Sequence, residues 1–229
     1  MKTKISNKSV AQNRFDKLFK TTIKATEKNS KIDTNKFTKE LKEIGDTFEK
    51  ESQKEKMNKN ARQLAERLVS LKNNKFAGII YSYLIKFNKG NQKIVEEYAT
   101  NALIIAKRQR DPVHIMARTN DLRDIYKITQ PNSDKYLSVL FDEKRALNDI
   151  INNYESAQKR YISTHREIKP IENYIEKLAA IKLEIGEVLL NKKEKHQAQI
   201  ELQEAFEIYQ RIGKGKNSEK IEKLLDTLK

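Results

Sequence analysis

The chain has 229 residues, of which 34% are charged and 37% hydrophobic, with six glycines, three prolines and no tryptophan. So few turn residues argue against a protein built mainly of strands, and this composition favours an all-helical fold. The absence of cysteine excludes a disulfide framework, a thiolate zinc site and a cysteine nucleophile. The formal net charge of +15 indicates either an acidic partner or a biased codon usage rich in Lys, Asn and Ile.

The first sixty residues contain two amphipathic stripes. The first predicts a helix over residues 8–28, on the stripe Phe15, Leu18, Phe19, Thr22 and Ile23. After NSKIDTN, Asp33 or Thr34 can cap a second helix to about Gln53, on the stripe Phe37, Leu41, Ile44 and Phe48. This region carries 16 Lys and Arg against 9 Asp and Glu. We therefore interpret residues 1–58 as a basic N-terminal helical arm ahead of a helical-repeat domain over residues 59–229.

The middle of the chain has a higher density of apolar residues. Three helices are predicted between Asn60 and Arg110, separated by KNNK and NKGN, with Gly90 suited to a helix C-cap. Asp111 and Pro112 favour the start of a further helix, which the segment TQPNSD ends.

A heptad-like spacing then predicts a long helix from Ser133 to about His165, in which Glu143 or Lys144 fills a gap in the apolar series. The same heptad-like spacing of apolar residues resumes after REIKP and predicts a second helix to about Leu189. Two long helices with a short connection are expected to form an antiparallel helical hairpin. No alternating strand pattern of useful length occurs.

The stretch EIGEVLLNKKEKHQAQIELQEAFEIYQRIG, residues 184–213, places Gly186, Ala198 and Ala205 at spacings of twelve and seven. Small residues at these spacings let two antiparallel helices approach closely. The pattern resembles a tetratricopeptide repeat over about residues 179–213. Lys182 stands where the resemblance implies an aromatic residue, and Lys182→Ala is expected to be nearly neutral. The resemblance implies an all-α, irregular tetratricopeptide-like helical array.

Such arrays bind peptides or protein segments on a concave surface, so the resemblance implies a protein–protein interaction adaptor or scaffold. The candidate partner-binding residues are Asn120, Asp124, Lys127, Glu187 and Asn191. The first three share a polar helix face opposite Leu122 and Ile125, which the resemblance would turn inward. The Lys and Asn clamp that some members use for C-terminal carboxylates is absent.

An alternative interpretation is a basic nucleic-acid-binding helical protein. The segment AKRQRDP is the densest arginine cluster, and the candidate phosphate-contacting residues are Arg108, Arg110 and Arg118. The competing interpretation is a solvated helix C-terminus, where cations interact favourably with the helix dipole.

The sequence predicts no enzyme, cofactor or metal site. His114, His165 and His196 lie far apart, and the paired carboxylates are of a kind common on helical surfaces. No phosphate-binding loop, dinucleotide fingerprint or nucleophile elbow occurs. The longest apolar run, residues 76–87, is too short to cross a bilayer, and the N-terminus lacks a run like that of a signal peptide. We therefore expect a soluble, cytoplasmic protein.

Overall fold

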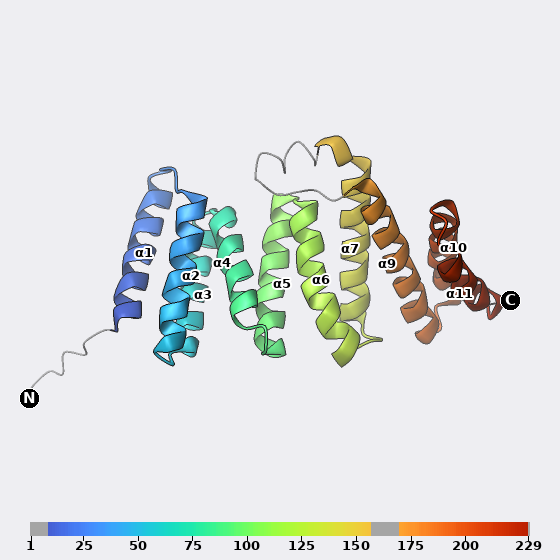
Figure 1. The fold of residues 1–229 in the computed structure, drawn as a ribbon, viewed down its shortest axis with the longest axis horizontal. Coiled ribbons are helices and arrows are strands. Elements are labelled where there is room, and N and C mark those ends of the chain that lie inside the picture. Colours follow the sequence, from blue (N-terminus) through green and yellow to red (C-terminus); the bar gives the residue numbers. More distant parts are fainter. Residues whose placement is uncertain (1–8, 157–169, 229) are drawn as a thin grey trace, which may run out of the picture. The chain divides into compact units, whose positions relative to one another are not determined.

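The computed structural model describes residues 9–156 and 170–228, and all regular structure in those ranges is helical. The helices in chain order are α1 (Val10–Glu27), α2 (Thr34–Lys50), α3 (Lys54–Ser70), α4 (Asn74–Phe87), α5 (Gln92–Gln109), α6 (Pro112–Thr129), α7 (Asp134–Asn152), α9 (Ile171–Asn191), α10 (Lys195–Arg211) and α11 (Gly215–Asp226) (Figure 1). The predicted all-α class is thus confirmed for the described residues. The chain divides into two compact units, Met1–Ile105 and Ala106–Lys229.

The N-terminal unit is built from helical hairpins. Helix α1 packs against α2 and α3 against α4, while α1 also contacts α3 and α2 contacts α4. The predicted apolar stripes form its core. There Phe15 packs edge-to-face with Phe48, and Phe37 with Phe76, with ring centroids 6.5 and 5.0 Å apart, respectively. The boundary predicted at residue 58 falls inside α3. The described helices of the predicted arm are therefore part of a larger packed unit.

Helix α4 ends differently from the sequence prediction, although NKGN does form the loop after it. Its C-cap is Asn88, and Gly90 does not adopt a left-handed conformation. The buried Asn88 amide donates to the Leu84 carbonyl oxygen at 2.8 Å and exchanges two hydrogen bonds with the Asn58 amide, at 2.8 and 2.9 Å. Side-chain amides therefore complete this helix end, and glycine is not required there.

One turn geometry recurs between helices in both units. A residue with φ between 50° and 72° lies just after the helix end at Asn29, Ser52, Lys72, Arg110, Lys193 and Gly213. In each case the next residue donates its backbone N–H to the carbonyl five residues earlier, as Asn73 does to Leu68 at 2.8 Å. This is the Schellman arrangement, in which glycine is the usual left-handed residue. Because only one of the six uses glycine, the sequence does not reveal the recurrence.

Replacing a left-handed lysine with glycine should stabilise the protein. We expect Lys72→Gly to raise the free energy of unfolding by about 0.5–1 kcal/mol, because glycine adopts φ > 0 without the Cβ penalty. Lys59 is an exposed lysine inside α3, so Lys59→Gly should instead lower it by about 1 kcal/mol. Urea titration of both variants measures the sign of each change in the free energy of unfolding. Two losses of equal size would contradict the strained-turn interpretation.

The C-terminal unit contains the predicted antiparallel pair of long helices. The Ser133 hydroxyl caps α7 by accepting the Tyr136 N–H at 3.1 Å. Helix α7 ends at Asn152, and the Asn153 side-chain amide donates to the Asp149 carbonyl oxygen at 3.1 Å. Residues 154–156, after this interruption, are helical again. The rest of that predicted helix, residues 157–165, lies outside the described residues. Helices α7 and α9 are antiparallel, since α7 packs along α9 with its first residue beside the last turn of α9.

The close approach predicted from the small residues is confirmed between α9 and α10. A Cβ atom added to Gly186 would lie 2.6 Å from Leu202 Cγ, so only glycine fits there without a shift. Ala198 and Ala205 are fully buried in the same interface. Leu202, Ala205 and Tyr209 of α10 form a core cluster with Ala179 of α9 and Ile221 of α11.

Candidate functional site

An open hollow of about 470 Å³ lies between α7, α9 and α10. Its lining residues come from all three helices and are Asn148, Lys182, Glu204, Glu207, Ile208 and Arg211. Four carry charge, one is an amide and one is apolar. The hollow is therefore a polar surface of mixed charge.

Lys182 is a buried cation in this hollow, and its environment corrects the sequence interpretation. Its side chain is only 7% exposed, and its ammonium group bonds to the carboxylate of Glu204. A second carboxylate oxygen, Glu201 Oε2, lies 3.7 Å from the same nitrogen. The side chain is therefore buried while its charged end reaches two carboxylates. Lys182→Ala is consequently not expected to be neutral.

Glu201 extends this network to α7. Its side chain is 9% exposed, and its other carboxylate oxygen bonds to Lys144. Glu201 Oε2 has no hydrogen-bond partner, because 3.7 Å to Lys182 is an ion-pair distance beyond hydrogen-bond range. Charges taken out of water are costly unless they are paired and hydrogen-bonded. A partly satisfied charge network beside an open hollow therefore marks a candidate binding site.

The sequence DEKR, residues 142–145 of α7, supplies a second buried network. Asp142 bonds to Lys107 of α5, whereas the fully buried Glu143 lies 3.4 Å from Arg123 of α6 and 2.7 Å from Lys177 of α9. Three consecutive side chains thus contact four other helices, since Lys144 reaches α10. The gap in the heptad series at Glu143 and Lys144 was the signal for this buried charge.

The three predicted partner-binding residues of α6 lie along its solvent-facing side. Asp124 and Lys127 are exposed, and the half-buried Asn120 accepts a hydrogen bond from Arg123 at 3.2 Å. The ammonium group of Lys127 lies 2.9 Å from Glu184 of α9. This ion pair joins the exposed Lys127 of α6 to Glu184 of α9, whose side chain is only 15% exposed.

The two predicted residues of α9 contact other segments. Glu187 lies 2.5 Å from Lys220 of α11, and the Asn191 amide donates to Asn132 at 3.1 Å. None of the five predicted residues lines the hollow, and we call the surface of α6 and α9 that carries them the α6–α9 face. Their role in binding stays a prediction.

Two groups beside the α6–α9 face have shifted pKa values. Burial, followed by the hydrogen bond to Glu184, raises the pKa of the Tyr136 hydroxyl. The hydrogen bond from Lys192 lowers the pKa of the Asp134 carboxyl. Burial and the hydrogen bond thus keep the Tyr136 hydroxyl neutral, whereas the Asp134–Lys192 ion pair is exposed on its Asp134 side.

The predicted phosphate-contacting arginines differ in their exposure. Arg108 and Arg110 are exposed, and Arg110 occupies a left-handed turn after α5. The Arg118 side chain is 15% exposed and lies 3.1 Å from Asp121. Two of the three are therefore open to solvent, and phosphate binding by this cluster stays a prediction.

Within residues 9–156 and 170–228, no group of three His, Asp or Glu side chains is placed to hold a metal ion. His114 bonds to Asp111 at 2.7 Å, and His196 is exposed. His165 lies outside the described residues. In the same ranges no helix combines the length and apolarity needed to cross a membrane.

No family model matches the chain, and no curated protein matches it significantly. Among solved structures, BtubC (BKLC) from P. vanneervenii is similar at 11% identity and a TM-score of 0.33, over 90% of this chain and 93% of that one. A circular tandem repeat protein with novel repeat topology is similar at 14% identity and a TM-score of 0.30, over 93% of this chain and 44% of that one. The DHF119 filament is similar at 14% identity and a TM-score of 0.28, over 96% of this chain and 95% of that one. Scores this low do not establish a shared arrangement of helices.

Proposed function

We propose that the chain is a helical-repeat scaffold that binds a segment of a partner protein in the hollow between α7, α9 and α10. The observation that carries this proposal is the buried network of Lys182 and Glu201 beside an open surface. A structural core needs no such charges, since apolar residues of similar volume stabilise a fold at least as well. The tetratricopeptide-like pattern of residues 179–213 supports the same class of function.

The lining favours a polypeptide ligand over an apolar small molecule. Beside the Lys182–Glu204 ion pair, Arg211 offers a cation, Glu207 a carboxylate and Asn148 an amide. A peptide segment with charged side chains can pair with Glu207 and Arg211, whereas an apolar molecule cannot pair with either. A volume of about 470 Å³ is within the range of ligand-binding clefts.

The test compares two charge-swapped variants of the same unit. Peptides selected from a random display library are titrated by fluorescence anisotropy against the wild type, against Glu207→Lys with Arg211→Glu, and against Asp124→Lys with Lys127→Glu. Both double variants keep the net charge, and all four side chains lie within helices, Glu207 and Arg211 in α10 and Asp124 and Lys127 in α6. We expect the first to weaken binding by about tenfold or more and the second by less than about twofold.

Three results would contradict the proposal. The first is the reverse order, which would place the binding site on the predicted α6–α9 face. The second is equal affinity for all three proteins, and the third is failure of any peptide to enrich.

A further inference from the structure

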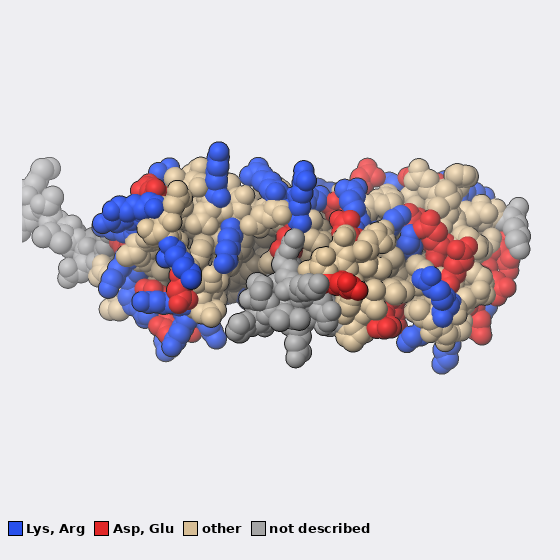
Figure 2. Space-filling model, turned by 90° about the horizontal axis from the view of Figure 1, so that it is seen from above, with Lys and Arg blue, Asp and Glu red and all other residues tan. Residues whose placement is uncertain are grey.

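The positive charge of the chain is concentrated in the N-terminal unit. Residues 1–105 contain 23 Lys and Arg against 12 Asp and Glu, whereas residues 106–229 contain 24 against 20. Figure 2 shows Lys and Arg side chains over α1–α4 and more frequent acidic side chains over α9–α11. A compositional bias acting on the whole chain does not by itself account for this difference between units.

The arginines of the N-terminal unit are already engaged. Arg14 lies 2.9 Å from Glu43, and Arg67 lies 3.4 Å from Glu27. Arg62 lies 2.8 Å from Glu66 and 2.5 Å from Glu97. The cations of this unit that remain for an external anion are therefore mainly lysines.

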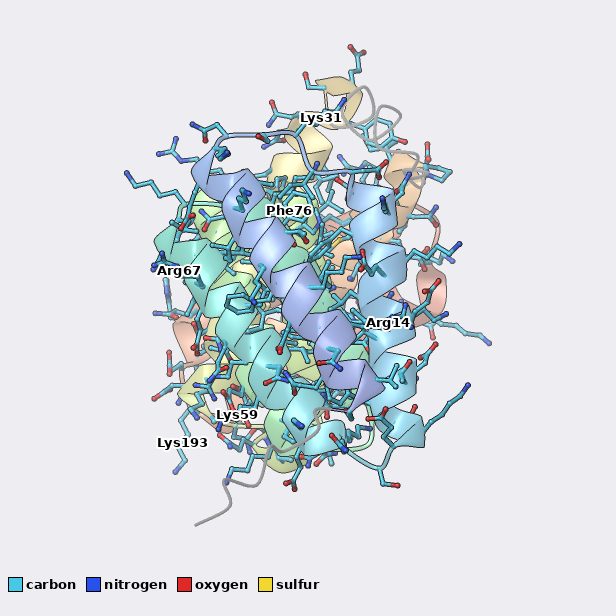
Figure 3. The ribbon with its side chains drawn as sticks, turned by 90° about the vertical axis from the view of Figure 1, so that its left-hand side faces the viewer. Arg14, Lys31, Lys59, Arg67, Phe76 and Lys193 are labelled. Atoms are coloured by element: carbon cyan, nitrogen blue, oxygen red, sulfur yellow. The ribbon has the colours of Figure 1, made fainter. Side chains whose placement is uncertain are left out.

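Three of these lysines form a stripe on α1, which we call the α1 lysine stripe: Lys17, Lys20 and Lys24. They occupy positions i, i+3 and i+7, and all three are exposed. With a rise of about 1.5 Å per residue, they are spaced by about 4.5 and 6 Å along the helix axis. Figure 3 looks onto this end of the unit, with α1 in front, Arg14 to one side, and Lys59 and Arg67 of α3 to the other.

The stripe borders an open hollow of about 510 Å³, lined by Asn13, Asp16, Lys17, Lys20 and Thr21. The single carboxylate among these lining residues, Asp16, accepts a hydrogen bond from the Gln12 amide at 2.7 Å. The described lining thus presents the ammonium groups of Lys17 and Lys20, which can donate to phosphate oxygens, whereas the Thr21 hydroxyl already donates to the Lys17 carbonyl oxygen at 2.9 Å.

We propose that the α1 lysine stripe binds the phosphate backbone of a nucleic acid. A membrane surface fits less well, because the apolar face of α1, with Phe15 and Leu18, is buried within the unit and has nothing to insert beside the lysines. The stripe is not placed to recognise particular bases. The three arginines of this unit, which could bind base edges, are paired with carboxylates. Phe15 and Phe19 of α1, which could stack on bases, pack against each other with ring centroids 6.4 Å apart. Binding is therefore electrostatic and independent of sequence.

This inference does not rest on the proposed peptide site, which lies on residues of the other unit. Peptide binding is expected to weaken only in the variant of Glu207 and Arg211, and nucleic-acid binding only in the variant of the α1 lysine stripe. The two proposals can therefore be contradicted separately.

The experiment removes equal charge from the two units of the full chain. One variant carries Lys17→Gln, Lys20→Gln and Lys24→Gln, and the control carries Lys195→Gln, Lys216→Gln and Lys223→Gln, three exposed lysines of the C-terminal unit. Glutamine has nearly the helix propensity of lysine, so both variants should fold. Affinity for a labelled oligonucleotide of about 20 nucleotides, single-stranded or duplex, is measured between about 50 and 200 mM salt.

We expect salt-dependent binding by the wild type, with a slope in log K against log salt that falls in magnitude by about 2–3 in the stripe variant. Affinity at the lowest salt should fall by about tenfold or more in that variant and by less than about threefold in the control. Equal losses in both variants, or absence of salt-dependent binding by the wild type, would overturn the proposal. Stronger binding to phosphatidylserine vesicles or to polyglutamate than to the oligonucleotide would overturn it as well.

Discussion

Gly45→Ala is expected to destabilise the N-terminal unit by about 1–3 kcal/mol, although the same change inside most helices is stabilising. A Cβ atom at Gly45 would lie 1.6 Å from the hydroxyl oxygen of Tyr83 and 2.7 Å from Cζ. That hydroxyl is buried, and the ring stacks on Phe87 at 5.5 Å, so Tyr83 has little room to move. The clash should therefore outweigh the gain in helix propensity of about 1 kcal/mol.

Gly78 of α4 provides the matched control. A Cβ atom there would meet its nearest neighbour, Ile105 Cγ2, at 3.8 Å, which is an ordinary contact. Gly78→Ala should accordingly raise the free energy of unfolding by up to about 1 kcal/mol. Tyr83→Phe removes the closest atom, so the cost of Gly45→Ala should be smaller in that background. If chemical denaturation shows both glycine variants to be stabilised, the packing of α2 on α4 is incorrect.

Glu143→Gln should cost about 2 kcal/mol or more. Glu143 is fully buried between Arg123 and Lys177, and removal of its charge leaves two cations facing a neutral amide. Their side chains retain 20% and 29% exposure, so part of the cost is screened by water.

Glu187→Gln tests the same chemistry at an exposed ion pair. Glu187 and Lys220 are 37% and 57% exposed, and the loss there should stay below about 1 kcal/mol. Urea titration of the two variants side by side measures the difference. Equal losses would show that Glu143 does not hold α6, α7 and α9 together.

The sequence was sufficient to predict the helices, because each one buries a continuous apolar stripe whose period is visible in the residues. Phe15 and Leu18 of α1 and Gly186 and Ala205 of the α9–α10 interface are examples. Helix ends were less predictable. The side-chain amides of Asn88 and Asn153 donate to carbonyl oxygens at the ends of their helices, and five of the six left-handed turns use residues other than glycine.

The candidate site could not be predicted, because charged residues on helices are usually solvated. Lys182 and Glu143 appear in the sequence as departures from an apolar pattern, and only the packing of several helices shows that each meets opposite charges. The hollow depends on the same packing, since α7, α9 and α10 each contribute lining residues. Of the predicted residues of α6, Asp124 and Lys127 are exposed and Asn120 is half-buried, and their role in binding stays a prediction.

Binding of a protein segment in the hollow can be followed by methyl NMR of isoleucine-labelled protein during titration with a selected peptide. Ile208 lines the hollow, whereas Ile128 is 74% exposed on α6 next to Lys127. If the peptide binds in the hollow, we expect the Ile208 methyl signal to shift in a saturable manner while the Ile128 signal stays in place. A saturable shift of Ile128 with no change at Ile208 would contradict it.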